Sequence, residues 1–437
     1  MQAFSRVLAA CLPLLSAVVG RGWLVVLSAL ASVALAMPAQ AEEAAPTALS
    51  AQEFLARAGR SHPSLPLLEA AIEEAAANVT AAGLWANPSL SYDREEVFAG
   101  GRGQPENFVR LALPLEISGR RGLNAEGAEL GLEAARATSA RERSGLLFDA
   151  LRIYWSAAQA RQGLGVLRQE REALGKLVEA VRSRTFAGDA SGYDLDRLEL
   201  EVETLEDLVA DAEREVEGWQ RRIALLVGAP GERFDASDPL VLPGQPQSSV
   251  GLVQQALAAR ADYRAARLRV AQAERELSAG RRGWVPTLVL SGGAKSAAVS
   301  ESESAWGYVA GLALGVPLFD HGQGEVARAH ARLRQAEGEQ RLIEAQVTTE
   351  VMTAYGALAR FRAQAERFER TQVPRLESLE RRAQISYQEG ERPVFELLDA
   401  YRTARGVRLR LVELRQKARL AEIDLTRATG QSPGGAP

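Results

Sequence analysis

Hydrophobic and polar positions recur with the period of an α-helix over two very long stretches of the chain. The first stretch is Ser118–Thr185, which contains no proline, and the second is His321–Tyr387. At about 1.5 Å per residue, one helix over the first stretch would be roughly 100 Å long, far longer than a compact domain needs. A second helical pattern follows each stretch, at Ser191–Val227 and at Pro393–Thr429. The pattern therefore predicts two long helical hairpins, and Pro374 predicts a break in the second one.

Two shorter segments with alternating apolar positions precede each hairpin and predict β-strands. The strands are expected over residues 89–98, 107–116, 285–299 and 306–319, and the hairpins over 118–227 and 321–429. A helix is expected before each strand pair. The first opens at a capping box formed by Ser50 and Glu53 and runs to about Leu84, and the second covers residues 249–280. Each half of the chain would then contain a helix, two strands, a long helix and a returning helix.

Similar residues recur in the two halves at a nearly constant spacing, which indicates an internal duplication. Five landmarks recur at offsets between 199 and 203 residues: Trp85 with Trp284, Pro114 with Pro317, Tyr154 with Tyr355, Gly188 with Gly390, and Gly228 with Gly430. Because these landmarks are of different types, chance similarity between two alanine-rich helices explains them poorly. We therefore expect a first repeat over residues 42–228, a proline-containing linker over 229–248, a second repeat over 249–430 and a disordered tail over 431–437.

The expected strands have the length and alternation of strands that cross a membrane. In the last strand, Tyr308 and Leu312 face one side, while Gly311 and Ala313 face the other. Segments of about ten residues with one apolar face suit a tilted transmembrane strand. No run of eighteen apolar residues follows Ala41, so no helix is expected to span a bilayer. Four strands cannot close a barrel, so a sheet in lipid would require several copies to pool their strands. A small soluble sheet on a coiled coil is the alternative that the alternation leaves open.

The N-terminal segment predicts that the protein is exported, and the composition argues against several other functions. An apolar core over Trp23–Ala36 follows Arg6 and Arg21 and precedes a small-residue cleavage motif, so residues 1–41 are expected to form a secretory signal peptide. The 437-residue chain has a net charge of −4 and one cysteine, Cys11, which falls in that signal. We therefore expect neither a disulfide framework nor a nucleic-acid partner. Three histidines without metal-ligand spacing predict no metal site, cofactor or catalytic residue.

Several short motifs recur around the strands and hairpin turns: Trp85-Ala-Asn-Pro88, Leu113-Pro-Leu-Glu-Ile-Ser-Gly-Arg120, Leu314-Gly-Val-Pro-Leu-Phe319 and the turns at Gly188 and Gly390. In these motifs, and over roughly Leu49–Gly430, the chain resembles the TolC-like outer-membrane efflux factors. The Asn-Pro and Pro-Leu-Glu elements look most similar to the branch that serves heavy-metal cation pumps. The resemblance implies a mainly α fold with β: a homotrimer with a twelve-stranded β-barrel in the outer membrane of a Gram-negative bacterium, on a long periplasmic α-helical barrel. It further implies three partners, namely a periplasmic adaptor (membrane fusion) protein, an inner-membrane RND-type pump and outer-membrane lipid.

The function that the resemblance implies is that of a passive exit duct in a tripartite efflux system, without catalysis. Divalent metal cations are the expected cargo, with drug efflux or type I secretion through the same kind of channel as alternatives. A soluble periplasmic coiled-coil adaptor is the alternative from another class.

The same resemblance assigns roles to residues at the hairpin turns. Asp194, Tyr387 and Arg392 would close a periplasmic gate, and Glu396 and Asp399 would line its entrance with carboxylates that attract cations. The alternative is that these are ordinary solvated charges of polar turns.

Overall fold

The computed structural model describes residues 46–99, 102–245, 248–298 and 303–433. Contacts divide the chain into two units, residues 1–47 and 48–437, and the fold described below belongs to the second unit. The expected signal peptide over 1–41 and the last residues of the expected tail, 434–437, lie outside the described residues. In the described part, no helix is both long enough and apolar enough to cross a membrane.

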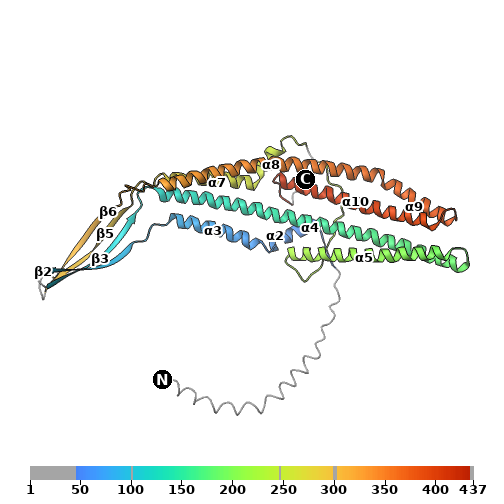
Figure 1. Cartoon of the computed structure of the whole chain (residues 1–437), viewed down its shortest axis with the longest axis horizontal. Coiled ribbons are helices and arrows are strands. Elements are labelled where there is room, and N and C mark those ends of the chain that lie inside the picture. Colours follow the sequence, from blue (N-terminus) through green and yellow to red (C-terminus); the bar gives the residue numbers. More distant parts are fainter. Residues whose placement is uncertain (1–45, 100–101, 246–247, 299–302, 434–437) are drawn as a thin grey trace, which may run out of the picture. The chain divides into compact units, whose positions relative to one another are not determined.

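Helices make up most of the described chain (Figure 1). They are α2 (Ala51–Ser61), α3 (Leu65–Gly83), α4 (Arg120–Ala187), α5 (Gly192–Leu226), α6 (Leu252–Ala259), α7 (Ala261–Gly280), α8 (Gln323–Thr371), α9 (Val373–Gln388) and α10 (Val394–Ala428). The strands are β1 (Thr47–Leu49), β2 (Ser89–Ala99), β3 (Arg102–Leu115), β4 (Phe234–Ala236), β5 (Leu288–Ala298) and β6 (Ser304–Leu314). A pair of strands therefore precedes each of the two long helical hairpins, α4 with α5 and α8–α9 with α10.

Two helices that the sequence predicted as continuous are each broken once, which corrects the prediction. The predicted helix from Ser50 to Leu84 does begin at the capping box of Ser50 and Glu53, but it is interrupted at residues 62–64. Pro63 disfavours the helical conformation of the residue before it, and the backbone of His62 is extended (φ −60°, ψ 128°).

The helix predicted over residues 249–280 is divided at Arg260, whose backbone is also extended (φ −72°, ψ 126°). The buried guanidinium of Arg260 pairs with Asp262 (2.6 Å) and with Glu350, and it donates to the main-chain oxygen of Ala428 (3.3 Å). This contact with α8 and α10 is long-range and therefore invisible in a local pattern. The break predicted at Pro374 is confirmed, because α8 ends at Thr371 and α9 begins with proline in its first turn.

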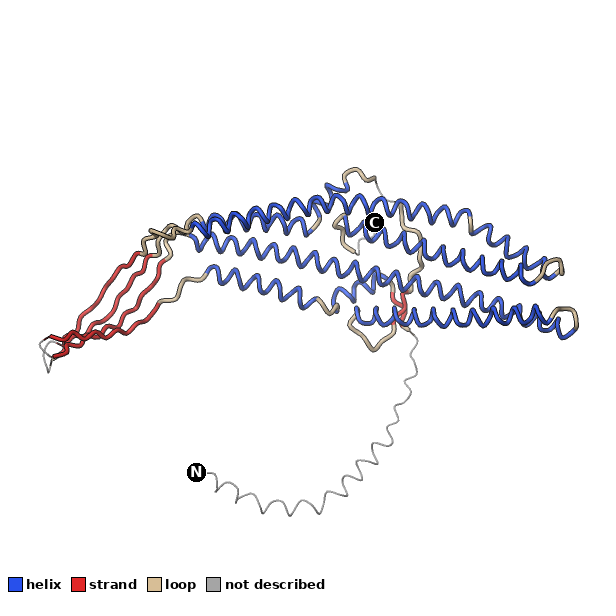
Figure 2. Tube along the Cα trace, viewed as in Figure 1, coloured by secondary structure: helices blue, strands red, loops and turns tan. Residues whose placement is uncertain are grey.

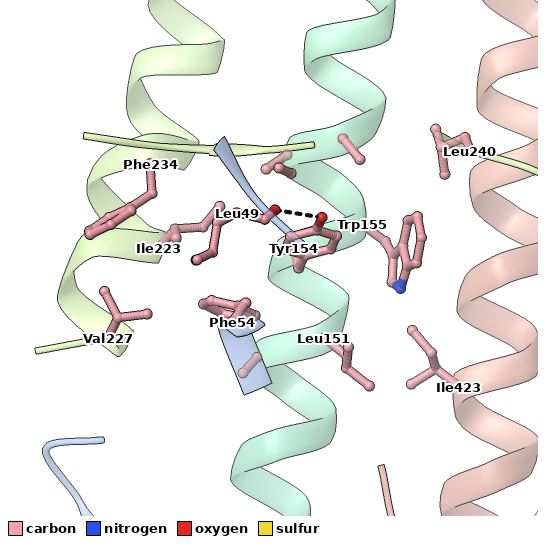
Figure 3. Close-up of a cluster of buried hydrophobic side chains, with 14 of the residues drawn as sticks. Leu49, Phe54, Leu151, Tyr154, Trp155, Ile223, Val227, Phe234, Leu240 and Ile423 are labelled. Atoms are coloured by element: carbon pink, nitrogen blue, oxygen red, sulfur yellow. Dashed lines mark hydrogen bonds between the residues drawn. The ribbon is translucent and has the colours of Figure 1, made fainter. Parts of the chain in front are cut away.

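Helix α4 contacts α3, α5, α7 and α10, so it lies at the centre of the helical packing (Figure 1). The largest buried cluster surrounds Tyr154 of this helix (Figure 3). The Tyr154 ring stacks on Phe54 (5.6 Å between centroids) and meets Trp155 edge-on (5.3 Å). Its hydroxyl donates to the carbonyl oxygen of Leu49 (2.8 Å) and accepts from the N–H of Asp238 (3.1 Å). One side chain thus holds two distant segments against α4.

The segment between the two halves, which the sequence predicted as a linker over 229–248, takes part in this core. Phe234 and Leu240 are fully buried in the Tyr154 cluster, and β4 pairs with β1. The N–H of Ser237 donates to the carbonyl oxygen of Leu49 (3.0 Å). Prolines in this segment prevent a helix but do not prevent burial of its apolar side chains.

The four longer strands form one antiparallel sheet in the order β2-β3-β5-β6, shown in red beyond the helices in Figure 2. The register places Leu113 opposite Leu290, and Leu290 opposite Leu312. Because side chains alternate along a strand, the register gathers exposed apolar side chains on one face: Leu90, Tyr92, Val109, Leu111, Leu113, Leu290, Trp306, Tyr308, Leu312 and Leu314. The other face carries mainly polar and small residues, among them Ser91, Asp93, Arg110, Ser291, Gly293, Lys295 and Gly311, together with Val97, Phe108, Val289 and Val309. We call the first of these the apolar face of the sheet.

Candidate functional site at the hairpin turns

Both long hairpins turn at a glycine in the left-handed conformation. Gly188 has φ 86° and Gly390 has φ 74°, values that residues with a side chain rarely adopt. After Gly188, the N–H of Asp189 donates to the carbonyl oxygen of Arg184 (2.8 Å), which closes the end of α4. The returning helix α5 begins after Ser191, whose side chain accepts the N–H of Tyr193 (3.2 Å). These local devices define where each hairpin reverses.

Tyr387 and Asp194 lie near each other, although they belong to different hairpins. Tyr387 is 7% exposed and packs in an apolar cluster with residues of α4, α5 and α10: Val181, Leu198, Val394, Leu397 and Leu398. Burial, followed by the nearby charge of Asp194, raises the pKa of Tyr387. The structure therefore brings two of the three predicted gate residues together within one chain.

Arg392, the third predicted gate residue, is engaged elsewhere. Its Nη1 atom donates to both carboxylate oxygens of Glu396 at 3.0 Å, one helical turn away. Both side chains are largely exposed, so this pair contributes little to stability, about 0.2–1 kcal/mol. Among the described residues, no ion pair joins Arg392 to Asp194. Within a single chain, the predicted gate arginine thus neutralises one of the predicted entrance carboxylates.

Glu396 and Asp399 lie on the exposed face of α10, while Leu397 and Leu398 between them are buried. Asp399 lies close enough to Arg402 to raise its pKa, although Glu201 is the larger cause. Over the ranges that the structure covers, no group of three or more His, Cys, Asp or Glu side chains is arranged to hold a metal ion. The geometry here suits weak electrostatic attraction rather than tight binding.

A second charged group, which the sequence prediction missed, lies deeper between the hairpins. Glu170 of α4 and Glu201 of α5 are only 4% and 3% exposed. The Nη1 atom of Arg405 lies 3.5 Å from a carboxylate oxygen of each, and Nε of Arg402 donates to Glu201 (3.0 Å). One carboxylate oxygen of Glu170, Oε2, is buried with no hydrogen-bond partner in the described part of the chain. We call these four residues the buried charge cluster.

Burial raises the pKa of Glu170 to about 7, despite the opposing charge of Arg405. Burial acts on Glu201 in the same direction, but hydrogen bonds and charge from Arg402 and Arg405 hold its pKa below the ordinary value. The two carboxylates of the buried charge cluster therefore differ in their affinity for a proton.

The sequence did contain a signal for the buried charge cluster. Glu170 lies three residues after Leu167 and four before Leu174, which places it within an apolar stripe of α4. Glu201 has the same relation to Leu198 and Leu205 on α5. A carboxylate at a position otherwise occupied by leucine predicts a buried and paired charge.

Comparison with known proteins shows a similarity to one family. Residues 252–431 match the family described as outer membrane efflux protein. The chain is 24% identical to the cobalt-zinc-cadmium resistance protein CzcC of Cupriavidus metallidurans over 392 residues, which cover 89% of this chain and 91% of that protein. The second half of the chain thus matches the outer membrane efflux protein family, and a relative at 24% identity extends the similarity over most of the chain. These similarities agree with the predictions of an efflux channel protein in the outer membrane and of a function other than catalysis.

Other relatives agree with this similarity. The chain is 27% identical to the nickel-cobalt-cadmium resistance protein NccC of Alcaligenes xylosoxydans xylosoxydans over 307 residues, which cover 68% of this chain and 67% of that protein. The fold is similar to that of the outer membrane protein VceC of Vibrio cholerae, with a TM-score of 0.71 at 19% identity, covering 87% of this chain and 96% of that one. A mainly helical fold with a sheet, as predicted, is therefore shared with a solved outer membrane protein.

Proposed function

We propose that this protein is the passive exit duct of a tripartite efflux system for divalent metal cations. The observation that carries the proposal is the sheet register, which gathers apolar side chains of all four strands on one exposed face. Such a face suits lipid, and the polar and small residues of the other face suit an aqueous lumen.

Three copies of the chain would complete the barrel. In the described residues, β2 and β6 are the outer strands of the sheet, and each has one edge without a pairing strand. Unpaired edges are not tolerated in lipid, so the edge of β6 in one copy would pair with β2 of the next. Three copies supply twelve strands and form a closed ring with cyclic symmetry. The long hairpins of the three copies would then form the periplasmic tunnel.

The proposed domain organisation follows the order of elements. A first repeat over residues 42–228 and a second over 249–430 each supply one strand pair and one long hairpin, joined by the segment 229–248. A signal peptide over residues 1–41 would direct export. The hairpin turns would lie furthest from the membrane, where a periplasmic adaptor (membrane fusion) protein and an inner-membrane RND-type pump can dock.

The turns would act as a gate. In a closed trimer, Asp194 and Tyr387 of neighbouring hairpins would be held together, and Arg392 would exchange Glu396 for an acceptor on a neighbouring copy. Such exposed links contribute little each, so a docked partner can supply the free energy that opens them. Rings of Glu396 and Asp399 would favour cations at the entrance.

The names of the two relatives support a metal cargo, since they refer to resistance to nickel, cobalt, cadmium and zinc. The test is a strain that lacks this gene, challenged in parallel with those divalent metals and with hydrophobic drugs. We expect increased sensitivity to the metals alone, restored by the wild-type gene on a plasmid. Drug sensitivity with unchanged metal tolerance would refute the metal cargo.

A further inference from the structure

The junction between the sheet and the helices combines exposed apolar side chains with arginines that have no acidic partner. Large apolar side chains lie exposed just beyond the strand ends: Leu84, Trp85, Ile117, Trp284, Val316, Leu318 and Phe319. Phe319 is 91% exposed, Trp284 61% and Trp85 54%, so the described chain leaves more than half of each of these side chains uncovered. We call these residues the junction belt. Large aromatic side chains are typical of the level at which a membrane protein meets the lipid head groups.

The junction belt continues the apolar face of the sheet. Ile117 lies two residues after Leu115, where β3 ends, and Trp284 lies in a turn four residues before Leu288, where β5 begins, so both lie close to strand ends that carry the apolar face. The apolar surface therefore extends from the strands to the start of the long helices. On the proposed function, the junction belt lies at the periplasmic boundary of the lipid layer.

Three guanidinium groups lie at the same level. The guanidinium of Arg121 covers the Trp85 ring at 3.7 Å from its centroid and donates to the carbonyl oxygen of Gly83 (3.0 Å). Arg282 donates to the carbonyl oxygen of Ser118 (3.1 Å), and the side chain of Arg281 is exposed.

No carboxylate in the described part of the chain pairs with any of these three guanidinium groups. The nearby acids are used otherwise. Glu116 accepts the backbone N–H groups of Arg120 and Arg121 (3.1 and 3.0 Å), and Asp320 accepts the N–H of Gly322 (3.0 Å). Glu325 pairs with Arg120. Three positive charges thus stay uncompensated next to an exposed apolar belt.

We propose that Arg121, Arg281 and Arg282 form a binding site for the phosphate of an anionic phospholipid, whose acyl chains cover the junction belt. The proposal rests on the proposed function, because it requires the apolar face to lie in lipid. Charge complementarity selects a phosphate, since guanidinium groups bind phosphate through several donors at once. Continuity with the apolar face selects a lipid rather than a free anion. The site would fix the depth of the protein in the membrane at the strand ends.

The test uses the purified full-length protein in detergent, titrated with phosphatidylglycerol or with phosphatidylcholine, and counts bound lipid by native mass spectrometry. We expect wild-type protein to prefer phosphatidylglycerol. The triple variant Arg121→Gln, Arg281→Gln, Arg282→Gln should lose this preference, and Arg281→Gln alone should lower the apparent affinity about fivefold. The single variant keeps the test valid if the triple variant does not fold, because its side chain is exposed.

A matched control removes the same charge elsewhere. Arg367, Arg375 and Arg381 are exposed on α8 and α9, far along the chain from the junction. Their triple glutamine variant should keep the wild-type preference for phosphatidylglycerol. Equal binding of the two lipids by wild-type protein would overturn the proposal, as would displacement of phosphatidylglycerol by an equal concentration of inorganic phosphate.

Different results would refute the proposed function and the proposed lipid site. If the lipid site is wrong but the channel is right, wild-type protein conducts ions in planar bilayers and shows no lipid preference. If the proposed function is wrong, wild-type protein neither conducts nor fractionates with the outer membrane.

Discussion

Replacing Glu170 by glutamine tests the buried charge cluster through the pH dependence of stability. The carboxylate of Glu170 is 4% exposed, one of its oxygens has no hydrogen-bond partner in the described part of the chain, and burial raises its pKa from 4.5 to about 7. Groups that face it from other helices are Arg405, Glu201, Arg408 and Glu380, of which the arginines oppose the rise and the acids increase it. Glutamine has nearly the same shape but cannot ionise.

The expected sign follows from proton binding. The folded protein holds the Glu170 proton more tightly than the unfolded chain does, so this contribution to stability is complete below about pH 4.5 and is lost as the pH rises through about 7. The difference between the pKa of Glu170 in the unfolded chain, 4.5, and in the folded protein, about 7, corresponds to about 3 kcal/mol of unfolding free energy in total. About 2.5 kcal/mol of this is lost between pH 5 and pH 8. Relative to the variant, wild-type protein should therefore lose about 2.5 kcal/mol of unfolding free energy per chain over that interval.

The assay is thermal and urea unfolding of detergent-solubilised protein, followed by circular dichroism at several pH values. Glu172→Gln is the matched control, because Glu172 lies on the same helix, is exposed and has its pKa lowered by Lys176. This control should show no loss of the same sign. Parallel pH curves for wild-type protein and Glu170→Gln would refute the argument that Glu170 is buried at a cost to folding.

Four further outcomes are expected. Arg392→Ser should raise single-channel conductance in planar bilayers and also strengthen cation preference, because it frees the Glu396 carboxylate; unchanged conductance would exclude Arg392 from the gate. Asp194→Ala should raise conductance without a gain in cation preference, and equal gains in both variants would contradict the link between Arg392 and Glu396. The double variant Glu396→Gln, Asp399→Asn should weaken cation selectivity, which an unaltered reversal potential would disprove. Tyr154→Phe should lower the free energy of unfolding by about 1–2 kcal/mol, because the half-buried N–H of Asp238 loses its partner, whereas the carbonyl oxygen of Leu49 keeps the N–H of Ser237. A melting temperature equal to that of wild-type protein would show that the N–H of Asp238 finds another partner.

The sequence by itself determined the elements whose causes are local. Helical periodicity predicted both hairpins, Pro374 predicted the break in the second, and the capping box of Ser50 and Glu53 predicted the start of α2. The turns at Gly188 and Gly390 were also predictable, because a left-handed residue at a helix end selects glycine. Short motifs then indicated the family, because related proteins share such motifs and they can be read without knowledge of the fold.

Tertiary structure alone decided the features that depend on contacts between distant residues. The helix break at Arg260 goes with contacts of its guanidinium to α8 and α10. Phe234 and Leu240, between the two halves, are buried because they pack in the Tyr154 cluster. The pairing of Arg392 with Glu396, instead of with Asp194, depended on side-chain geometry at the turn. The protonation of Glu170 also depends on distant contacts. Sequence spacing places its carboxylate in an apolar stripe, but the neighbouring helices determine which charges face it and how far its pKa moves.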